Sequence, residues 1–210
     1  MGYDVYGVSP KINKDYPERY NEILKQYGKD GFLDWNNTPE DVKDEYFNLK
    51  DNYEDDNPGS YFRNNVWFWR PLWDFVIETC EDYMTHDEMD GGYSNSGHRI
   101  KEKTALYIAK KLSEKLDDGT VDELQKATES KIAKAKAHNK KVRAKMDKIG
   151  DECKKKHGKD LVPANYPEPY NTKWQEAYSK EDWSSNYPFH RDNVKSFIEF
   201  CKQSGGFEIC

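Results

Sequence analysis

One stretch of the chain constrains its fold more than any other. Residues 59–74 read GSYFRNNVWFWRPLWD and hold three of the six tryptophans. Read with a period of two, the residues before Pro71 alternate between two faces, as in a strand. Pro71 suits the first position of a helix, where its missing N–H costs nothing, and apolar residues follow it at helical spacing. We therefore predict a strand followed by a helix, and a continuous helix kinked at Pro71 is the alternative.

The same stretch is the first candidate for a binding site. A forked guanidinium suits phosphate or carboxylate, side-chain amides can read a base edge, and indole faces stack on rings. The alternative is a structural core, in which the tryptophans are buried and the polar side chains satisfy local backbone groups. Arginine is costly to bury without a partner, so the ligand hypothesis stays open. The predicted ligand-binding residues are Arg63, Asn64, Asn65, Trp67, Trp69, Arg70, Trp73 and, from a later segment, His98.

Composition indicates a modest, aromatic-rich core. Hydrophobic residues make up 35% of the 210 residues, charged residues 34% and aromatic residues 14%. Such a chain is long enough to bury a core and carries much solvated helix around it. Residues 1–7 lack the pattern of a signal peptide, and no run of eighteen apolar residues occurs. The four cysteines form no CxxC pair, which favours reduced thiols. We expect a cytoplasmic protein.

The remaining patterns predict an α+β fold with a small, mostly antiparallel sheet and about six helices, one of them long and basic. A strand is expected at 4–7, and helices at 17–27, ended by Gly28, and from Thr38, which we expect as the N-cap. Another helix is predicted over 100–116. The C-terminal segment should form a helix over 192–201 and then a strand, which we expect to pair with the first strand or with 61–68.

Residues 121–153 contain no proline and predict one helix of roughly 30 residues. From 131 to 156 there are eleven basic and three acidic residues, while 29–56 holds ten acids and three lysines. We predict a single core domain of 1–119 plus 160–210, with 120–159 as a projecting basic helix. It could bind nucleic acid through phosphates, but it lacks aromatic residues for stacking, so nucleic acid is not favoured. Self-association or a protein partner through 121–156 is the alternative, and we expect no membrane partner.

Two further constellations could supply chemistry. The segment with His86, Asp87, Glu88, Asp90, Asn95 and His98 could hold a divalent cation or supply an acid and a base, but it lacks any established ligand spacing. We predict a solvated loop there. A cysteine nucleophile would draw on Cys80, Cys201 or Cys210 with His98 or His190, although cysteines on apolar helix stripes are usually inert. No catalytic residue, cofactor or metal is therefore predicted.

Several motifs together resemble one protein family. They are MGYDVYG at 1–7, YFRNNVWFWRPLW at 61–73 and SGGFEIC at 204–210, and the resemblance extends over about 1–7, 59–119 and 186–210. The order of these motifs is similar to that in a family of uncharacterised small proteins encoded by bacteria and bacteriophages. The resemblance implies a shared α+β core with variable insertions and carries no activity. Some members have a CxxC-type zinc ribbon in the insertion, where this chain has Cys153 and His157, too few ligands for a structural zinc.

Three functions follow from these patterns. The first is a non-catalytic binding protein, a phage-type accessory factor that binds or sequesters a nucleotide-like or other anionic small molecule. The second is an enzyme acting on a nucleotide or nucleic acid through the segment from His86 to His98. The third is an assembly scaffold that uses the acidic surface of 29–56 and the basic surface of 131–156.

Overall fold

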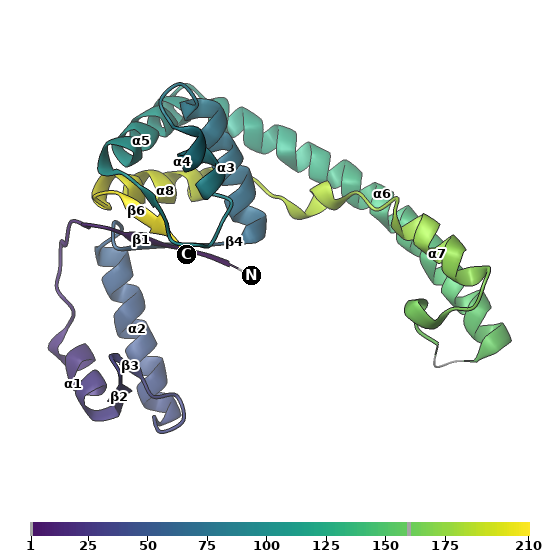
Figure 1. Cartoon of the computed structure of the whole chain (residues 1–210), viewed down its shortest axis with the longest axis horizontal. Helices are drawn as coiled ribbons and strands as arrows, with labels where there is room; N and C mark the ends of the chain where they lie inside the picture. Colours follow the sequence, from purple (N-terminus) through teal and green to yellow (C-terminus); the bar gives the residue numbers. More distant parts are fainter. Residues whose placement is uncertain (1, 159–160) are drawn as a thin grey trace. The chain divides into compact units, whose positions relative to one another are not determined.

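The computed structural model describes residues 2–158 and 161–210 and divides into two compact units (Figure 1). Unit 1 joins the chain up to Thr120 with Arg191–Cys210, and unit 2 comprises Val121–His190. The strands of unit 1 are β1 (Gly2–Gly7), β2 (Gly28–Lys29), β3 (Phe32–Leu33), β4 (Tyr61–Asn65), β5 (His98–Ile100) and β6 (Phe207–Ile209). Its helices are α1 (Glu18–Tyr27), α2 (Glu40–Asp56), α3 (Val66–Cys80), α4 (His86–Gly91), α5 (Glu102–Asp117) and α8 (Arg191–Gln203).

The α+β class is confirmed, but the helix count is not. The described residues form eight α-helices rather than about six. One helix that was not predicted is α4, which lies in the segment expected to be a loop. Thr85 accepts a hydrogen bond from the backbone N–H of Glu88, and the Glu88 carboxylate accepts one from the N–H of Thr85. This reciprocal capping box stabilises a helix too short to show a periodicity in the sequence.

The main sheet has four strands in the order β4-β1-β6-β5, and every pairing is antiparallel. The predicted pairing of the C-terminal strand with the first strand is confirmed, because β6 lies beside β1. Asp4 N–H donates to the Cys210 carbonyl at 2.9 Å, and Cys210 N–H donates to the Asp4 carbonyl at 2.8 Å. The two ends of the chain therefore meet in the middle of the sheet, and β4 and β5 are its edges.

Two stacked indoles lie in the core of unit 1. Trp69 and Trp73 are 0% exposed, and their ring centroids lie 5.3 Å apart. The Nε1–H of Trp69 donates to the Gly92 carbonyl at 2.6 Å, and that of Trp73 donates to the Met89 carbonyl at 2.9 Å. Each indole thus buries its apolar surface while its one polar atom keeps a partner.

The predicted order of strand and helix after Gly59 is confirmed, but the predicted boundary is wrong. The helix begins at Val66, so Pro71 lies inside α3 and not at its first position. The cause is Asn65, whose side chain accepts hydrogen bonds from the backbone N–H groups of Trp67 and Phe68. Such a cap satisfies N–H groups that have no partner within the helix, and it starts the helix five residues before the proline.

A smaller apolar cluster lies between α1, α2 and the hairpin of β2 and β3. The helix predicted at 17–27 is confirmed, with Gly28 following its last residue. The hydroxyls of Tyr20 and Tyr46 lie 3.0 Å apart within this cluster. The prediction that Thr38 caps the next helix is wrong, because its hydroxyl donates to the Asp34 carbonyl and α2 starts after Pro39.

Unit 2 is built on α6 (Thr120–His157), with 38 residues against the roughly 30 predicted, or about 57 Å at 1.5 Å per residue. Its other elements are η1 (Pro163–Asn165), α7 (Tyr170–Tyr178) and η2 (Trp183–Asn186). The sequence analysis placed the segment from 160 onwards with the core domain, whereas the structure groups 161–190 with α6; residues 159 and 160 lie outside the described part.

Side chains of α6 hold this returning segment. Asn139 Nδ2 donates to the Asp182 carbonyl at 2.9 Å, and Asp182 N–H donates to Asn139 Oδ1 at 2.8 Å. Arg143 Nε lies 2.6 Å from Glu181 Oε1. The segment that follows α6 therefore packs back onto it. No described helix of either unit combines the length and apolarity that crossing a bilayer requires.

Candidate binding groove on unit 1

The predicted ligand-binding residues do not converge on one pocket. The alternation along β4 places Arg63 and Asn65 on its exposed side, while Asn64 is buried. Asn64 Nδ2 donates to Asn193 Oδ1 at 2.9 Å, and Asn65 is the cap of α3. These two amides are thus engaged in structural hydrogen bonds.

The aromatic and remaining polar residues are also dispersed. Trp69 and Trp73 have no exposed surface on which a ligand ring could stack, whereas Trp67 is 40% exposed and Arg70 is exposed on α3. His98 lies on β5, at the opposite edge of the sheet from β4. Its ring packs so closely on Gly91 that a Cβ there would lie 2.2 Å from it, and its buried Nε2 finds no hydrogen-bond partner among the described residues.

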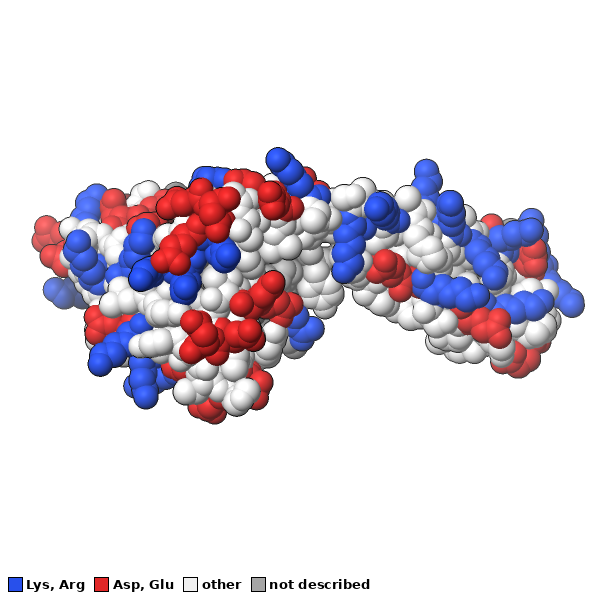
Figure 2. Space-filling view, turned by 90° about the horizontal axis from the view of Figure 1, so that it is seen from above, with Lys and Arg blue, Asp and Glu red and all other residues white. Residues whose placement is uncertain are grey.

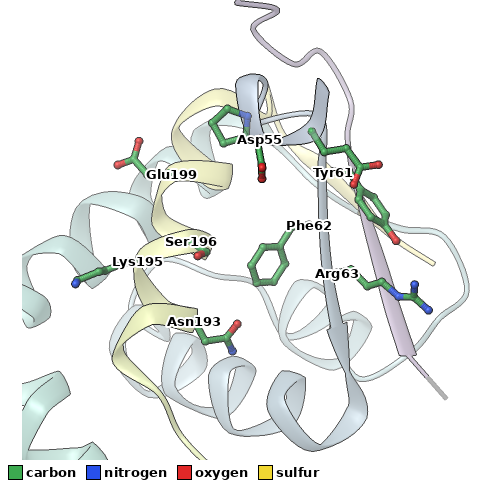
Figure 3. Close-up of a pocket in the computed structure, with 10 residues that line it drawn as sticks. Asp55, Tyr61, Phe62, Arg63, Asn193, Lys195, Ser196 and Glu199 are labelled. Atoms are coloured by element: carbon green, nitrogen blue, oxygen red, sulfur yellow. The ribbon is translucent and has the colours of Figure 1, made fainter. Parts of the chain in front are cut away.

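A groove of about 540 Å³ lies where β4, α8 and the end of α2 come together (Figure 3). Figure 3 shows the Phe62 ring directed toward Asn193 and Ser196 of α8, whereas the Arg63 side chain points to the other side of the strand. Three consecutive residues of β4 line the groove, so it follows the strand's edge and not one face of the sheet. The lining comprises Glu54, Asp55, Pro58, Tyr61, Phe62, Arg63, Asn193, Lys195, Ser196 and Glu199.

The hydrogen-bond pattern of the sheet leaves backbone groups of β4 directed outward. In β1, Asp4 exchanges both of its backbone hydrogen bonds with Cys210, so it makes none with its partner across β4, Arg63. Along an antiparallel ladder, hydrogen-bonded and non-hydrogen-bonded pairs alternate. The Tyr6–Tyr61 pair lies two residues away and is therefore also a non-hydrogen-bonded pair. The N–H and C=O groups of Tyr61 and Arg63 therefore point away from β1, toward the open edge beside the groove.

Arg63 keeps most of its hydrogen-bonding capacity. Its side chain is 71% exposed, and Nε lies 3.6 Å from Asp4 Oδ1, beyond hydrogen-bond length. The Tyr61 hydroxyl donates a hydrogen bond to that same Oδ1. Burial and, to a smaller extent, this hydrogen bond raise the pKa of Tyr61. Arg63 thus forms an exposed ion pair with Asp4 that lacks a hydrogen bond, and its guanidinium remains accessible to a further acceptor.

The other charges of the groove are mostly paired. Glu54 lies 3.3 Å from Lys50, Glu199 lies 2.7 Å from Lys202, and Lys195 lies 3.3 Å from Asp192. Burial raises the pKa of the Glu54 carboxyl above its ordinary value. The lining thus offers both signs of charge, with a cation at the Arg63 side and carboxylates at the end of α2 and on α8.

The segment from His86 to His98 and the cysteines are the alternative candidates for chemistry. Among the described residues there is no group of three or more His, Cys, Asp or Glu side chains that could hold a metal ion. Burial raises the pKa of Cys80 to about 12, and it raises that of Cys201 well above its ordinary value. Both thiols therefore stay protonated at neutral pH and are poor nucleophiles.

Several groove residues were missed by the sequence analysis. Phe62 lies in the predicted strand but is not among the predicted ligand-binding residues, and the contributions of α2 and α8 come from segments remote in sequence. The polar face of α8, which carries Asn193, Ser196 and Glu199, reads as an ordinary solvated face. The open edge of β4 follows from strand order, which local sequence does not encode.

Comparison of the chain with protein-family models, curated proteins and solved structures finds no match. The resemblance to bacterial and bacteriophage proteins therefore stays a prediction from the motifs.

Proposed function

We propose that the chain is a non-catalytic binding protein and that the groove of unit 1 binds an extended peptide segment as a strand added to the edge of β4. The observation that carries this proposal is the outward direction of the backbone groups of Tyr61 and Arg63 beside a groove of about 540 Å³. Exposed strand edges template the pairing of another chain, and many peptide-recognition modules use them in this way.

The side chains of the groove would select the peptide. An acidic residue opposite Arg63 would receive charge-assisted hydrogen bonds from the guanidinium. A basic residue at the other end would lie near Asp55 and Glu199. Between them, an apolar side chain would pack on Phe62, whose ring faces α8 (Figure 3). The expected ligand is an extended segment with one acidic and one basic end.

A fluorescein-labelled peptide of sequence EVTVTK, which as a strand has its glutamate on one face and its valines and lysine on the other, tests the proposal by fluorescence anisotropy. The same peptide with N-methylated backbone amides is the first control, because it keeps the side chains but cannot donate to the strand edge. We expect Arg63→Glu to weaken binding about tenfold, the value of one charge-assisted hydrogen bond. Arg99→Glu is the matched control, since Arg99 lies on the other edge strand and its side chain is also 71% exposed.

Equal affinity for the methylated peptide would refute strand addition. Equal losses in the two arginine variants would instead show that only net charge matters.

A second candidate is the anionic small molecule predicted from the sequence, and the exposed guanidinium of Arg63, whose ion pair with Asp4 lacks a hydrogen bond, favours it. A panel of phosphate-bearing ligands should then raise the melting temperature, and Arg63→Ala should abolish the rise. If no ligand of the panel shifts the melting temperature, this candidate is withdrawn and the peptide proposal is unaffected.

A further inference from the structure

The basic residues of unit 2 lie on an exposed and continuous surface. From Lys131 to Lys156, every lysine and arginine of α6 is exposed except the half-buried Lys154. Figure 2 shows blue side chains following one another along this helix, with red side chains among them. The residues of α6 that are buried in this range are Ala135, Asn139, Val142, Ile149, Gly150 and Cys153, which recur at helical spacing. The helix therefore turns one narrow face inward and presents its charges to solvent.

The returning segment places aromatic rings beside this helix. Trp174 and Tyr178 of α7 are stacked with ring centroids 5.2 Å apart, and Trp183 meets Tyr178 edge-on at 5.8 Å. Tyr178 is 38% exposed and Trp183 is 49% exposed. The hydrogen bonds of Asn139 with Asp182 hold this cluster against α6. The sequence analysis did not favour nucleic acid because 121–156 lacks aromatic residues, and the fold supplies those residues from a different segment.

Two grooves lie along the basic helix, and one of them also contains aromatic rings. One, of about 720 Å³, is lined by Arg143 and Lys154 together with Trp174 and Tyr178. Trp183 lines neither groove but contacts the Tyr178 ring. The other, of about 620 Å³, is lined by Lys136, Lys140 and Arg143 with polar groups of Asn139, Ser185 and Asn186. Arg143 and Asp147 line both, so the two grooves adjoin, and their lining residues span about 27 Å of α6 between residues 136 and 154. The acids of this path are Asp147, Asp151 and Glu181, the last paired with Arg143.

We infer that this path on unit 2 binds single-stranded nucleic acid. Lysines along a groove neutralise successive phosphates, and exposed aromatic rings stack on unpaired bases without regard to sequence. A rigid duplex keeps its bases stacked inside, so the rings of Tyr178 and Trp183 would gain nothing from it. An acidic polypeptide would be attracted by the same lysines, but it would leave the exposed rings without partners. The groove lysines together with the exposed aromatic rings therefore favour single-stranded nucleic acid over a duplex or an acidic polypeptide.

Fluorescence anisotropy of the full chain with a labelled oligodeoxythymidylate of about 16 nucleotides, the upper end of single-module site sizes, tests the inference. For about three phosphate contacts, the logarithm of the affinity should fall with the logarithm of salt with a slope of about −2. Replacing Trp183 or Tyr178 by alanine should weaken binding by about 5- to 160-fold, the range found for one stacked base. Trp35→Ala, which removes an indole of unit 1 that is 58% exposed, should leave the affinity unchanged.

The charge test uses two matched double variants of α6. Lys136→Glu with Lys140→Glu changes two residues that line a groove, and Lys141→Glu with Lys145→Glu makes the same charge change at exposed positions that line neither. The first pair should lower the salt slope by about 1.4, and the second should change it much less.

Equal effects of the two pairs, or no effect of the aromatic substitutions, would overturn the groove as the binding path. Poly-glutamate of matched length competing as well as the oligonucleotide would assign the surface to acidic polypeptides. Tighter binding of a duplex than of the single strand would also contradict the inference.

Discussion

Replacing Asn65 by alanine separates the structural role of this residue from the ligand-binding role that the sequence suggested. Its side-chain oxygen accepts hydrogen bonds from Trp67 N–H at 3.0 Å and Phe68 N–H at 3.1 Å. Alanine leaves both N–H groups to water, and losing such a cap costs about 1 kcal/mol, within a range of roughly 0.5–2. For a protein of this size, that corresponds to a fall of about 2–4 °C in melting temperature.

Asn65→Asp is the control that makes this prediction sharp. Aspartate keeps the acceptor and adds a negative charge at the helix N-terminus, where it contributes about 0.3–1 kcal/mol. We therefore expect the aspartate variant to match or exceed the wild-type stability. The measurement is urea unfolding followed by near-UV circular dichroism, which reports on the buried, stacked Trp69 and Trp73 of unit 1. If aspartate destabilises as much as alanine, or if alanine leaves the stability unchanged, Asn65 does not hold α3 in the way argued here.

Three further outcomes follow from local geometry. Gly206→Ala should destabilise the protein more than Gly119→Ala. Both glycines have similar positive φ angles, +88° and +86°, but only at Gly206 would a Cβ meet backbone atoms, at 2.8 Å. Thermal unfolding of the two variants therefore isolates the steric contribution. A thiol reagent at pH 8 should modify the partly exposed Cys210 in the native protein and reach the other three cysteines only in denaturant, since Cys80, Cys153 and Cys201 are buried. Burial raises the pKa of Glu54, so the folded state binds the carboxyl proton more tightly than the unfolded chain does. The folded state therefore loses stability as pH rises through this pKa. Glu54→Gln should raise the free energy of unfolding at pH 7 but not at pH 4, as measured by urea unfolding.

The parts of the fold that could be predicted are those with local signals. Gly28 marks the end of α1, and the apolar spacing marks α5 and α8. Alternation places Phe62 and Asn64 on one face of the strand and Arg63 on the other, as observed. The pairing of the terminal strand was also predicted, because an apolar chain end is more stable buried than in solvent.

The parts that could not be predicted depend on competition or on distant partners. Pro71 and Asn65 both signal a helix start. The helix begins directly after Asn65 because the Asn65 side chain satisfies two N–H groups, and Pro71 lies in the helix interior. The docking of 161–190 onto α6 depends on contacts such as Asn139 with Asp182, which are 43 residues apart. No periodicity within either segment records that contact.

The density of tryptophan, arginine and asparagine in 61–73 cannot by itself distinguish a binding site from a core. On a strand, neighbouring residues face opposite sides, so a dense motif supplies the core and the surface at once. The same run buries Phe62 and Asn64, exposes Arg63, and continues into a helix whose Trp69 and Trp73 are wholly enclosed. What identifies the candidate site is the phase of the hydrogen bonds across β1. Because Asp4 is bonded to Cys210, the backbone of Arg63 faces outward, and a shift of one residue in that phase would direct it inward and leave the groove without its open edge.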